Sequence, residues 1–144
     1  MVAEIAAHYI LSQTSAVTTL VGGTTAPNPR IYLGRRRQTT IMPSISIELD
    51  GVVPTDQKPD TPGASQGVSH LDTEDILVFS YGNTWTEANT LSRAVRTALD
   101  KKVAGTYNSI VVQSVQFLGE DYFDEDLDPI YYVFEHRYRL RIIR

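Results

Sequence analysis

Residues 71–100, LDTEDILVFSYGNTWTEANTLSRAVRTALD, contain the pattern on which the fold depends. The segment 76–81 combines β-branched and aromatic residues on both of its faces, which is typical of a central strand. The glycine and asparagine at 82–83 then favour a break in the chain. A buried strand followed closely by a second element indicates a sheet that is covered on at least one side.

A helix is predicted from about Trp85 to Asp100. Thr84 followed by Glu87 fits a capping box, in which the hydroxyl and the carboxylate satisfy backbone donors of the first turn. The predicted apolar face consists of Trp85, Ala88, Leu91, Val95, Ala98 and Leu99. A helix with one apolar face needs a partner layer, so we expect it to pack on the sheet.

Four more segments are predicted as strands. Residues 31–33 form a short apolar run, 41–49 alternate between apolar and polar, and 110–118 and 130–143 are expected to pair as a hairpin. In the last strand the even-numbered face is predicted to be buried and the odd-numbered face to be charged. The buried positions are Tyr132, Phe134, His136, Tyr138, Leu140 and Ile142.

The order of these elements predicts an α+β fold. An N-terminal helix is expected over 3–13, with a further short turn before the glycines at 22–23. The whole chain, 1–144, is then a single domain with a mostly antiparallel sheet of four to five strands and two main helices on one face. Residues 51–70 are rich in Pro, Gly, Ser, Thr and Asp and predict a long projecting loop or open hairpin.

Composition excludes several classes of protein. The chain has 144 residues, of which 42% are hydrophobic and 21% charged, which indicates a globular domain with one core. It has no cysteine, so disulfides and thiolate metal sites are excluded, in keeping with assembly in a reducing cytoplasm. The N-terminal segment lacks a basic leader and a cleavage site and is expected to be part of the mature fold. No apolar run approaches the length of a membrane-spanning helix.

Opposite charges occupy separate segments, although the net charge is only −4. Arginines cluster at 35–37, acids at 120–128 in a predicted hairpin tip (120–129), and basic residues return at the C-terminus. The candidate subunit or partner interface is Arg35, Arg36, Arg37, Asp56, Lys58, Asp60, Glu120, Asp121, Asp124, Glu125, Asp126 and Asp128. Three arginines without interleaved aromatic residues favour ion pairs with a protein over contact with nucleic acid, which stays an alternative.

Catalytic and metal-binding motifs fail in their contexts. Gly63–Gly67 match the nucleophile-elbow pattern around Ser65, but they lie in a Pro/Gly loop, not between a strand and a helix. The acids at 124, 126, 128 and 135 have the spacing of a calcium loop, but Pro129 occupies the position that requires glycine. The three histidines have no metal-ligand spacing. The sequence therefore predicts no enzyme, no catalytic or metal site and no cofactor, with adventitious cation binding by the acids as an alternative.

Several segments together resemble the tail-terminator or tail-completion proteins of long-tailed bacteriophages. They are VTTLVGG (17–23), RIYLG (30–34), MPSISIEL (42–49), ANTLSRAVRTAL (88–99) and the closing aromatic-basic strand. The resemblance covers nearly the whole chain and is carried by core positions. The acidic segment EDYFDEDLDP (120–129) and the loop 51–70 have no counterpart that can be mapped.

The resemblance implies a structural virion protein at the tail–neck junction, assembled in the host cytoplasm. Its expected form is a ring, a homohexamer, that caps the tail tube and joins it to the head–neck connector. The partners implied are further copies of the chain, the tail tube protein, the connector proteins, and DNA that passes the lumen without specific binding, with no membrane. Segregated charges suit the two complementary surfaces that a head-to-tail ring needs. The alternatives are a head-closure or connector ring subunit of the same particle, or an assembly module outside the virion.

Overall fold

The computed structural model describes residues 2–23, 29–34, 41–56, 70–100, 102–125 and 131–143; for 53–56, 70–71 and 123–125 only the backbone is described. The elements in chain order are α1 (Ala3–Ser12), α2 (Ser15–Thr18), β1 (Ile31–Leu33), β2 (Ser44–Asp56), β3 (His70–Gly82), α3 (Trp85–Leu99), β4 (Gly105–Tyr107), β5 (Ile110–Glu125) and β6 (Tyr131–Ile143). The α+β class is confirmed.

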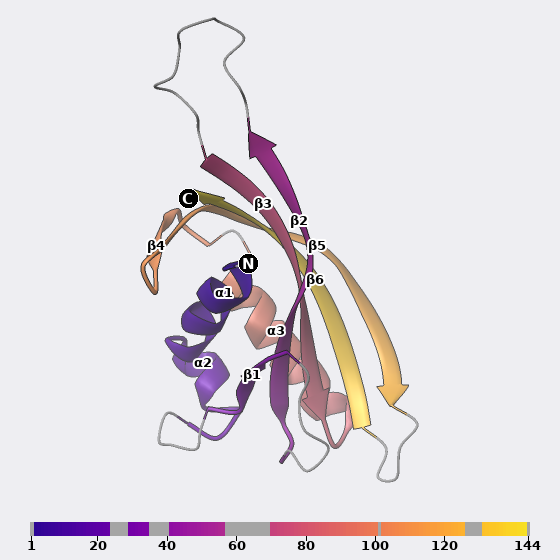
Figure 1. Cartoon of the computed structure of the whole chain (residues 1–144). Coiled ribbons are helices and arrows are strands. Elements are labelled where there is room, and N and C mark those ends of the chain that lie inside the picture. The colour runs from indigo at the N-terminus through magenta and orange to yellow at the C-terminus, as the bar shows by residue number, and fades with distance from the viewer. Residues whose placement is uncertain are drawn as a thin grey trace, which may run out of the picture.

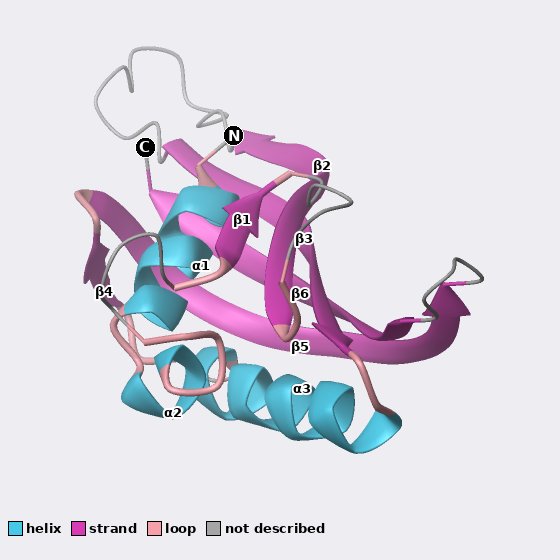
Figure 2. Ribbon diagram, turned by 90° about the horizontal axis from the view of Figure 1, so that it is seen from below, coloured by secondary structure: helices cyan, strands magenta, loops and turns pink. Residues whose placement is uncertain are grey.

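The strands form one six-stranded sheet in the order β1-β2-β3-β6-β5-β4. β1 runs parallel to β2, and every other neighbouring pair is antiparallel. The helices lie together on one side of this curved sheet (Figure 1), and the view from below shows α3 along the same side (Figure 2). We call the opposite side of the sheet the outer face.

The predicted strand number of four to five was too low. The additional strand is β4, whose sequence Gly-Thr-Tyr has no apolar run of the kind that predicted β1. It pairs with Ile110–Val112 at the start of β5. The prediction that 76–81 is a central strand is confirmed, since β3 is hydrogen-bonded to β2 on one side and to β6 on the other.

The core lies between the helices and the sheet. Ile45 and Ile47 of β2, Leu91 of α3 and Leu140 of β6 are fully buried there. All the predicted even-numbered positions of β6 from Phe134 to Ile142 are buried. Burial of a large aliphatic side chain stabilises the fold by roughly 1.5–3 kcal/mol. The amphipathic patterns of β6 and α3 therefore predicted correctly most of the residues that face the core between helices and sheet.

Trp85 is the exception on the predicted apolar face of α3. The side chain is 49% exposed, whereas Ala88, Leu91, Val95, Ala98 and Leu99 are buried. Thr84 caps the helix as predicted and accepts a hydrogen bond from the Glu87 backbone N–H at 3.1 Å. Trp85 is the first residue after this cap, and its ring contacts Phe134 of β6 while about half of the side chain stays exposed.

The first turn of α1 is held by a strand. No side chain of its own caps this helix. Instead, the fully buried Glu74 of β3 accepts hydrogen bonds through Oε2 from the backbone N–H groups of Val2 (3.2 Å) and Ala3 (2.7 Å). A carboxylate at a helix N-terminus satisfies orphan donors and complements the helix dipole. β3 therefore fixes where α1 begins.

The acidic segment was assigned wrongly at its start. Residues 120–125 of the predicted tip 120–129 continue β5 as regular strand, paired with β6 from His136 to Tyr131. In the segment 51–70, predicted as a projecting loop or open hairpin, residues 51–56 continue β2 and His70 begins β3, and the two strands pair antiparallel there. Residues 57–69 and 126–130 lie outside the described residues.

Candidate interaction surfaces

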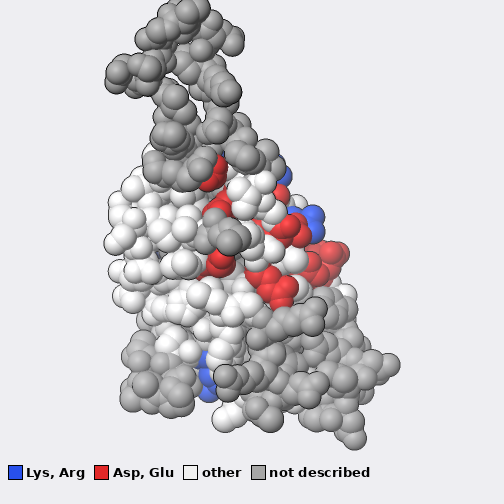
Figure 3. All heavy atoms as spheres, viewed as in Figure 1, with Lys and Arg blue, Asp and Glu red and all other residues white. Residues whose placement is uncertain are grey.

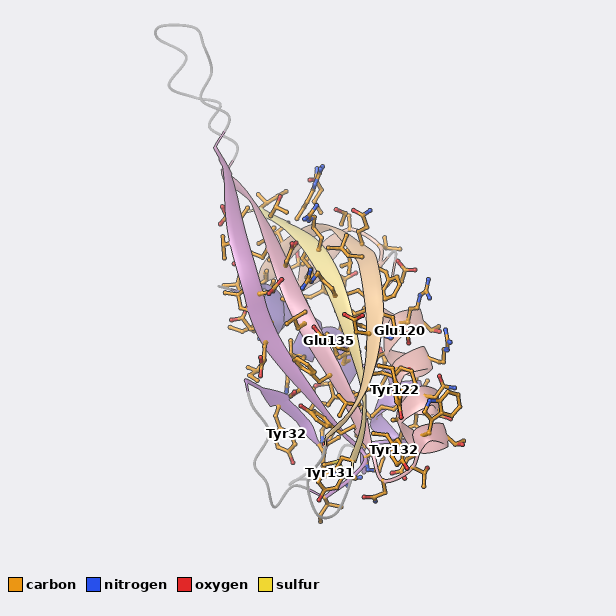
Figure 4. The ribbon with its side chains drawn as sticks, turned by 90° about the vertical axis from the view of Figure 1, so that its right-hand side faces the viewer. Tyr32, Glu120, Tyr122, Tyr131, Tyr132 and Glu135 are labelled. Atoms are coloured by element: carbon orange, nitrogen blue, oxygen red, sulfur yellow. The ribbon has the colours of Figure 1, made fainter. Side chains whose placement is uncertain are left out.

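The outer face carries charged side chains at alternate positions of neighbouring strands. Arg139 of β6 donates through Nε and Nη2 to the two carboxylate oxygens of Asp75 on β3, at 2.9 and 3.1 Å. The Nε of Arg137 lies 3.3 Å from Oδ2 of Asp50 on β2 and forms an ion pair with it. Figure 4 views this face of the sheet, with Glu135 in its middle. Arg137 and Arg139 are thus paired within the chain, and Arg141 is the further exposed arginine of β6 on this face.

Acidic side chains remain around Glu135 after these pairs are formed. Burial raises the pKa of the Glu135 carboxyl, and the negative charges of Asp121, Asp50 and Glu48 raise it further, while Arg137 opposes them. The hollow beside it has a volume of about 290 Å³. Acidic side chains gather toward the sheet side in the space-filling view (Figure 3). This face therefore suits a basic partner better than an acidic one.

A buried histidine connects β5 and β6 on the side of the helices. His136 is 1% exposed, and its Nε2 lies 3.0 Å from Oε1 of Glu120, while its Nδ1 lies 3.0 Å from the Tyr138 hydroxyl. Because a carboxylate only accepts, Nε2 donates to Glu120 and Nδ1 accepts from Tyr138. Burial lowers the pKa of His136, against the opposing influence of Glu120, and burial raises the pKa of Tyr138.

This histidine pair was missed in the sequence because residues 120 and 136 belong to different strands. Only the β5–β6 register, in which Glu120 lies opposite His136, brings them together. The contact lies in the packed interior, since His136 is buried. Arg96 of α3 lies over the Phe117 ring at 4.0 Å, and that ring packs edge-on against His136.

An aromatic patch lies where α3 begins, and we define it as Trp85, Tyr122 and Phe134. The Trp85 ring packs edge-to-face on Phe134 with centroids 5.9 Å apart, and the Tyr122 ring packs on Phe134 with centroids 4.9 Å apart. Tyr122 is 43% exposed. Figure 4 shows Tyr122 and Tyr132 beside this end of α3. Exposed tryptophan and tyrosine are enriched in protein–protein interfaces.

A groove lies at the other end of α3, and we call it the α3 groove. It has a volume of about 500 Å³. Its lining comes from the α1–α2 turn, the second half of α3 and the segment before β4. The residues are Thr14, Ala16, Arg93, Ala94, Thr97, Ala98, Asp100, Lys102 and Val103. Its floor is largely apolar, and two basic side chains belong to its lining.

Both long edges of the sheet are only partly covered within the described residues. β1 pairs with Ile45–Ile47 alone, and β4 pairs with Ile110–Val112 alone. The Asp100 carboxylate accepts a hydrogen bond from the Phe117 backbone N–H at 3.4 Å and so covers one further position of β5. Unpaired strand edges bind other strands unless charge or covering elements prevent it.

The predicted interface residues are distributed as follows. Glu120, Asp121, Asp124 and Glu125 lie in β5, and Asp56 is the last residue of β2. Glu120 is bound to His136, whereas Asp121 is exposed on the outer face. The predicted residues outside the described ranges are Arg35, Arg36, Arg37, Lys58, Asp60, Asp126 and Asp128.

The candidate serine nucleophile and the candidate calcium loop lie wholly or partly outside the described residues. Ser65 with its glycines lies outside the described residues, as do two of the acids with calcium-loop spacing. Within the described ranges, no group of three or more His, Cys, Asp or Glu side chains is arranged to hold a metal ion. None of the helices in the described part of the chain has the length and apolarity for a membrane crossing.

Comparison with known proteins shows a shared fold. No protein-family model matches the sequence, and no curated protein matches it. The structure is similar to a chain in the solved structure of the virion of a native gene transfer agent (GTA) particle, with a TM-score of 0.69 and 14% sequence identity. The similarity covers 99% of this chain and 95% of that chain. The two chains thus share one domain fold from end to end.

Proposed function

We propose that this chain is a structural protein of a phage-like virion, and specifically a subunit of the ring that caps the tail tube and joins it to the head–neck connector. The observation that carries the proposal is the fold similarity to a chain of the GTA virion over 99% of the present chain. The sequence segments that resemble tail terminators lie in the elements of this shared fold, in α2, β1, β2 and α3.

The surfaces support a role in assembly. A ring subunit must present two different surfaces to its neighbours, because head-to-tail contacts are heterologous. The aromatic patch and the α3 groove provide two such surfaces at opposite ends of one helix. The partly covered edges of β2 and β5 provide further places for neighbouring chains to bind.

The proposal includes no catalytic site and no cofactor. Among the described residues, His136 and Glu120 form a histidine–carboxylate pair of the kind that general acid–base catalysts use. The imidazole is 1% exposed and is held on both nitrogens by neighbouring side chains. A substrate could not reach it without opening the β5–β6 packing, which supports a structural role.

The acidic outer face suits a surface past which DNA moves. Tight DNA binding requires several lysine and arginine contacts to phosphate. On β6 Arg137 and Arg139 are both paired with carboxylates, and Arg141 is the further exposed arginine of this strand. In the proposed ring this face lines the lumen, so that DNA passes without specific binding. A ring structure with the outer face on the exterior would contradict this part.

A nonsense mutation in the gene, complemented or not by a plasmid copy, tests the proposal. Peptide mapping of purified particles first establishes whether the chain is incorporated. Without the tail cap, electron microscopy is expected to show overlong tails or tails not joined to heads, because nothing closes the tube. Normal tails together with heads that lose their DNA would instead identify a head-closure subunit. Normal infectious particles that lack the chain would identify an assembly module or a role outside the virion.

A further inference from the structure

The aromatic patch and the α3 groove lie too far apart to contact each other within one chain. α3 has 15 residues, and Trp85 begins it, while the groove lining on this helix starts at Arg93. At about 1.5 Å per residue the helix is roughly 22 Å long, and these two positions are separated by roughly 12 Å. Any contact between a patch and a groove therefore joins two molecules.

The aromatic patch and the α3 groove are complementary in shape and in charge. The patch presents the half-exposed Trp85 and Tyr122 over the buried Phe134, and the groove offers a largely apolar hollow of about 500 Å³. Such a volume accommodates a large aromatic side chain. Glu87 lies in the first turn of α3, next to the patch, while Arg93 and Lys102 line the groove. Asp100 also lines the groove, but it lies 3.9 Å from Arg96 and accepts from the Phe117 N–H.

We propose that the aromatic patch of one copy of this chain docks in the α3 groove of a second copy, with Trp85 as the anchor, and that this head-to-tail contact builds the ring. The inference rests on the proposed function in that a ring needs such a repeated contact. It goes further because it names the two surfaces. Repetition of one heterologous contact closes a ring when its rotation angle permits.

Two complementary variants test the contact. Trp85→Ala removes the anchor and leaves the groove intact. Thr97→Trp fills the groove from an exposed helix position and leaves the patch intact. Gln116→Trp is the matched control, because it adds the same side chain to an exposed position of β5 outside both surfaces. Thermal melting establishes that each variant is folded, and Trp85→Phe, which keeps an aromatic ring, is the conservative partner.

The masses of the species in solution give the main result. Wild type and Gln116→Trp are expected to form rings, and Trp85→Ala and Thr97→Trp are each expected to be monomers, with association weakened at least tenfold, roughly what truncation of an interface hot spot costs. Mixed together, the two defective variants should form a one-to-one heterodimer that stops there. One intact patch and one intact groove remain in the mixture, and only one contact can form. Trp85→Phe should assemble more strongly than Trp85→Ala.

Fluorescence supplies an independent measurement, since Trp85 is the sole tryptophan. Its emission should shift to the blue as the wild-type concentration rises, because docking takes a half-exposed indole out of water. Emission that stays unchanged while rings form would contradict the contact.

The failure of this inference differs from the failure of the proposed function. Rings formed equally by Trp85→Ala contradict the docking and leave the function in place. If the wild type is monomeric in solution, the amount of each variant in purified particles is measured instead. A Trp85→Ala chain that is as abundant in particles as the wild-type chain again contradicts the docking. A wild-type chain absent from particles contradicts the proposed function itself. Wild-type dimers that close on themselves contradict the ring.

Discussion

Glu74 offers the sharpest test of how the fold is held together. Its carboxylate is fully buried and accepts from the backbone N–H groups of Val2 and Ala3, at the start of a helix that has no cap of its own. Glu74→Ala removes this acceptor from the buried Ala3 N–H and from the partly buried Val2 N–H. Glu74→Gln keeps one acceptor oxygen of similar shape and removes the charge.

The expected loss of stability can be estimated from the donors concerned. An unsatisfied buried polar group costs about 1–3 kcal/mol. Ala3 is fully buried and Val2 is partly buried, so Glu74→Ala should lower the free energy of unfolding by about 3 kcal/mol. In a domain of this size that lowers Tm by about 6–12 °C. Glu74→Gln should cost about 1 kcal/mol, mainly from the lost interaction with the helix dipole.

Urea unfolding followed by circular dichroism measures these changes, at a concentration where light scattering shows one oligomeric state. Glu87→Gln is the matched control, because Glu87 is also a carboxylate in a first helical turn but its backbone N–H is capped by Thr84. It should stay within about 0.5 kcal/mol of wild type. The reasoning is refuted if Glu74→Ala is no less stable than Glu87→Gln.

Two further predictions concern the chain turn into α3 and the buried histidine. Gly82→Ala should lower the free energy of unfolding by about 1–3 kcal/mol, because an added Cβ would lie 2.5 Å from the Ala88 backbone nitrogen. Gly119→Ala, whose Cβ would meet nothing within 4 Å, is the control, and equal losses in thermal melting would contradict the reasoning. The pKa of His136 is lowered by burial from its ordinary value of 6.5, so the folded state binds fewer protons than the unfolded chain. Its stabilising contribution is present above pH 6.5 and is lost as the pH falls through the folded pKa. Urea unfolding between pH 7.5 and 5 should show this loss in wild type and a smaller one in His136→Gln; identical pH profiles would argue against it.

Local pattern predicted much of the fold. The Thr84–Glu87 spacing predicted the start of α3, and alternation predicted the buried face of β6. These features depend on residues near one another in the chain, so a propensity or a periodicity reveals them. β4 was missed because Gly105–Tyr107 includes a glycine and no apolar run, unlike the equally short 31–33. β5 was predicted to end at 118 because acids disfavour strands.

The candidate surfaces were predicted less well. The acidic segment was recognised. Which of its residues belong to β5, and which side of the sheet each one faces, depends on strand pairing. Trp85 was assigned to the core because its spacing matched the apolar stripe of α3. Its exposure depends on how the first turn of α3 packs on the sheet. The spacing of residues within a helix does not reveal that packing.

The sequence by itself determined the class of fold, the order of its main elements, the capped helix and the buried strand faces, because these follow from interactions over a few residues. Only the tertiary structure decided the partners of distant residues: Glu74 with the first turn of α1, Glu120 with His136, and Arg139 with Asp75. Each of these contacts joins separate elements through sheet register or helix docking. The physical reason is that a register sets which side chains face each other, and it results from packing of the whole domain.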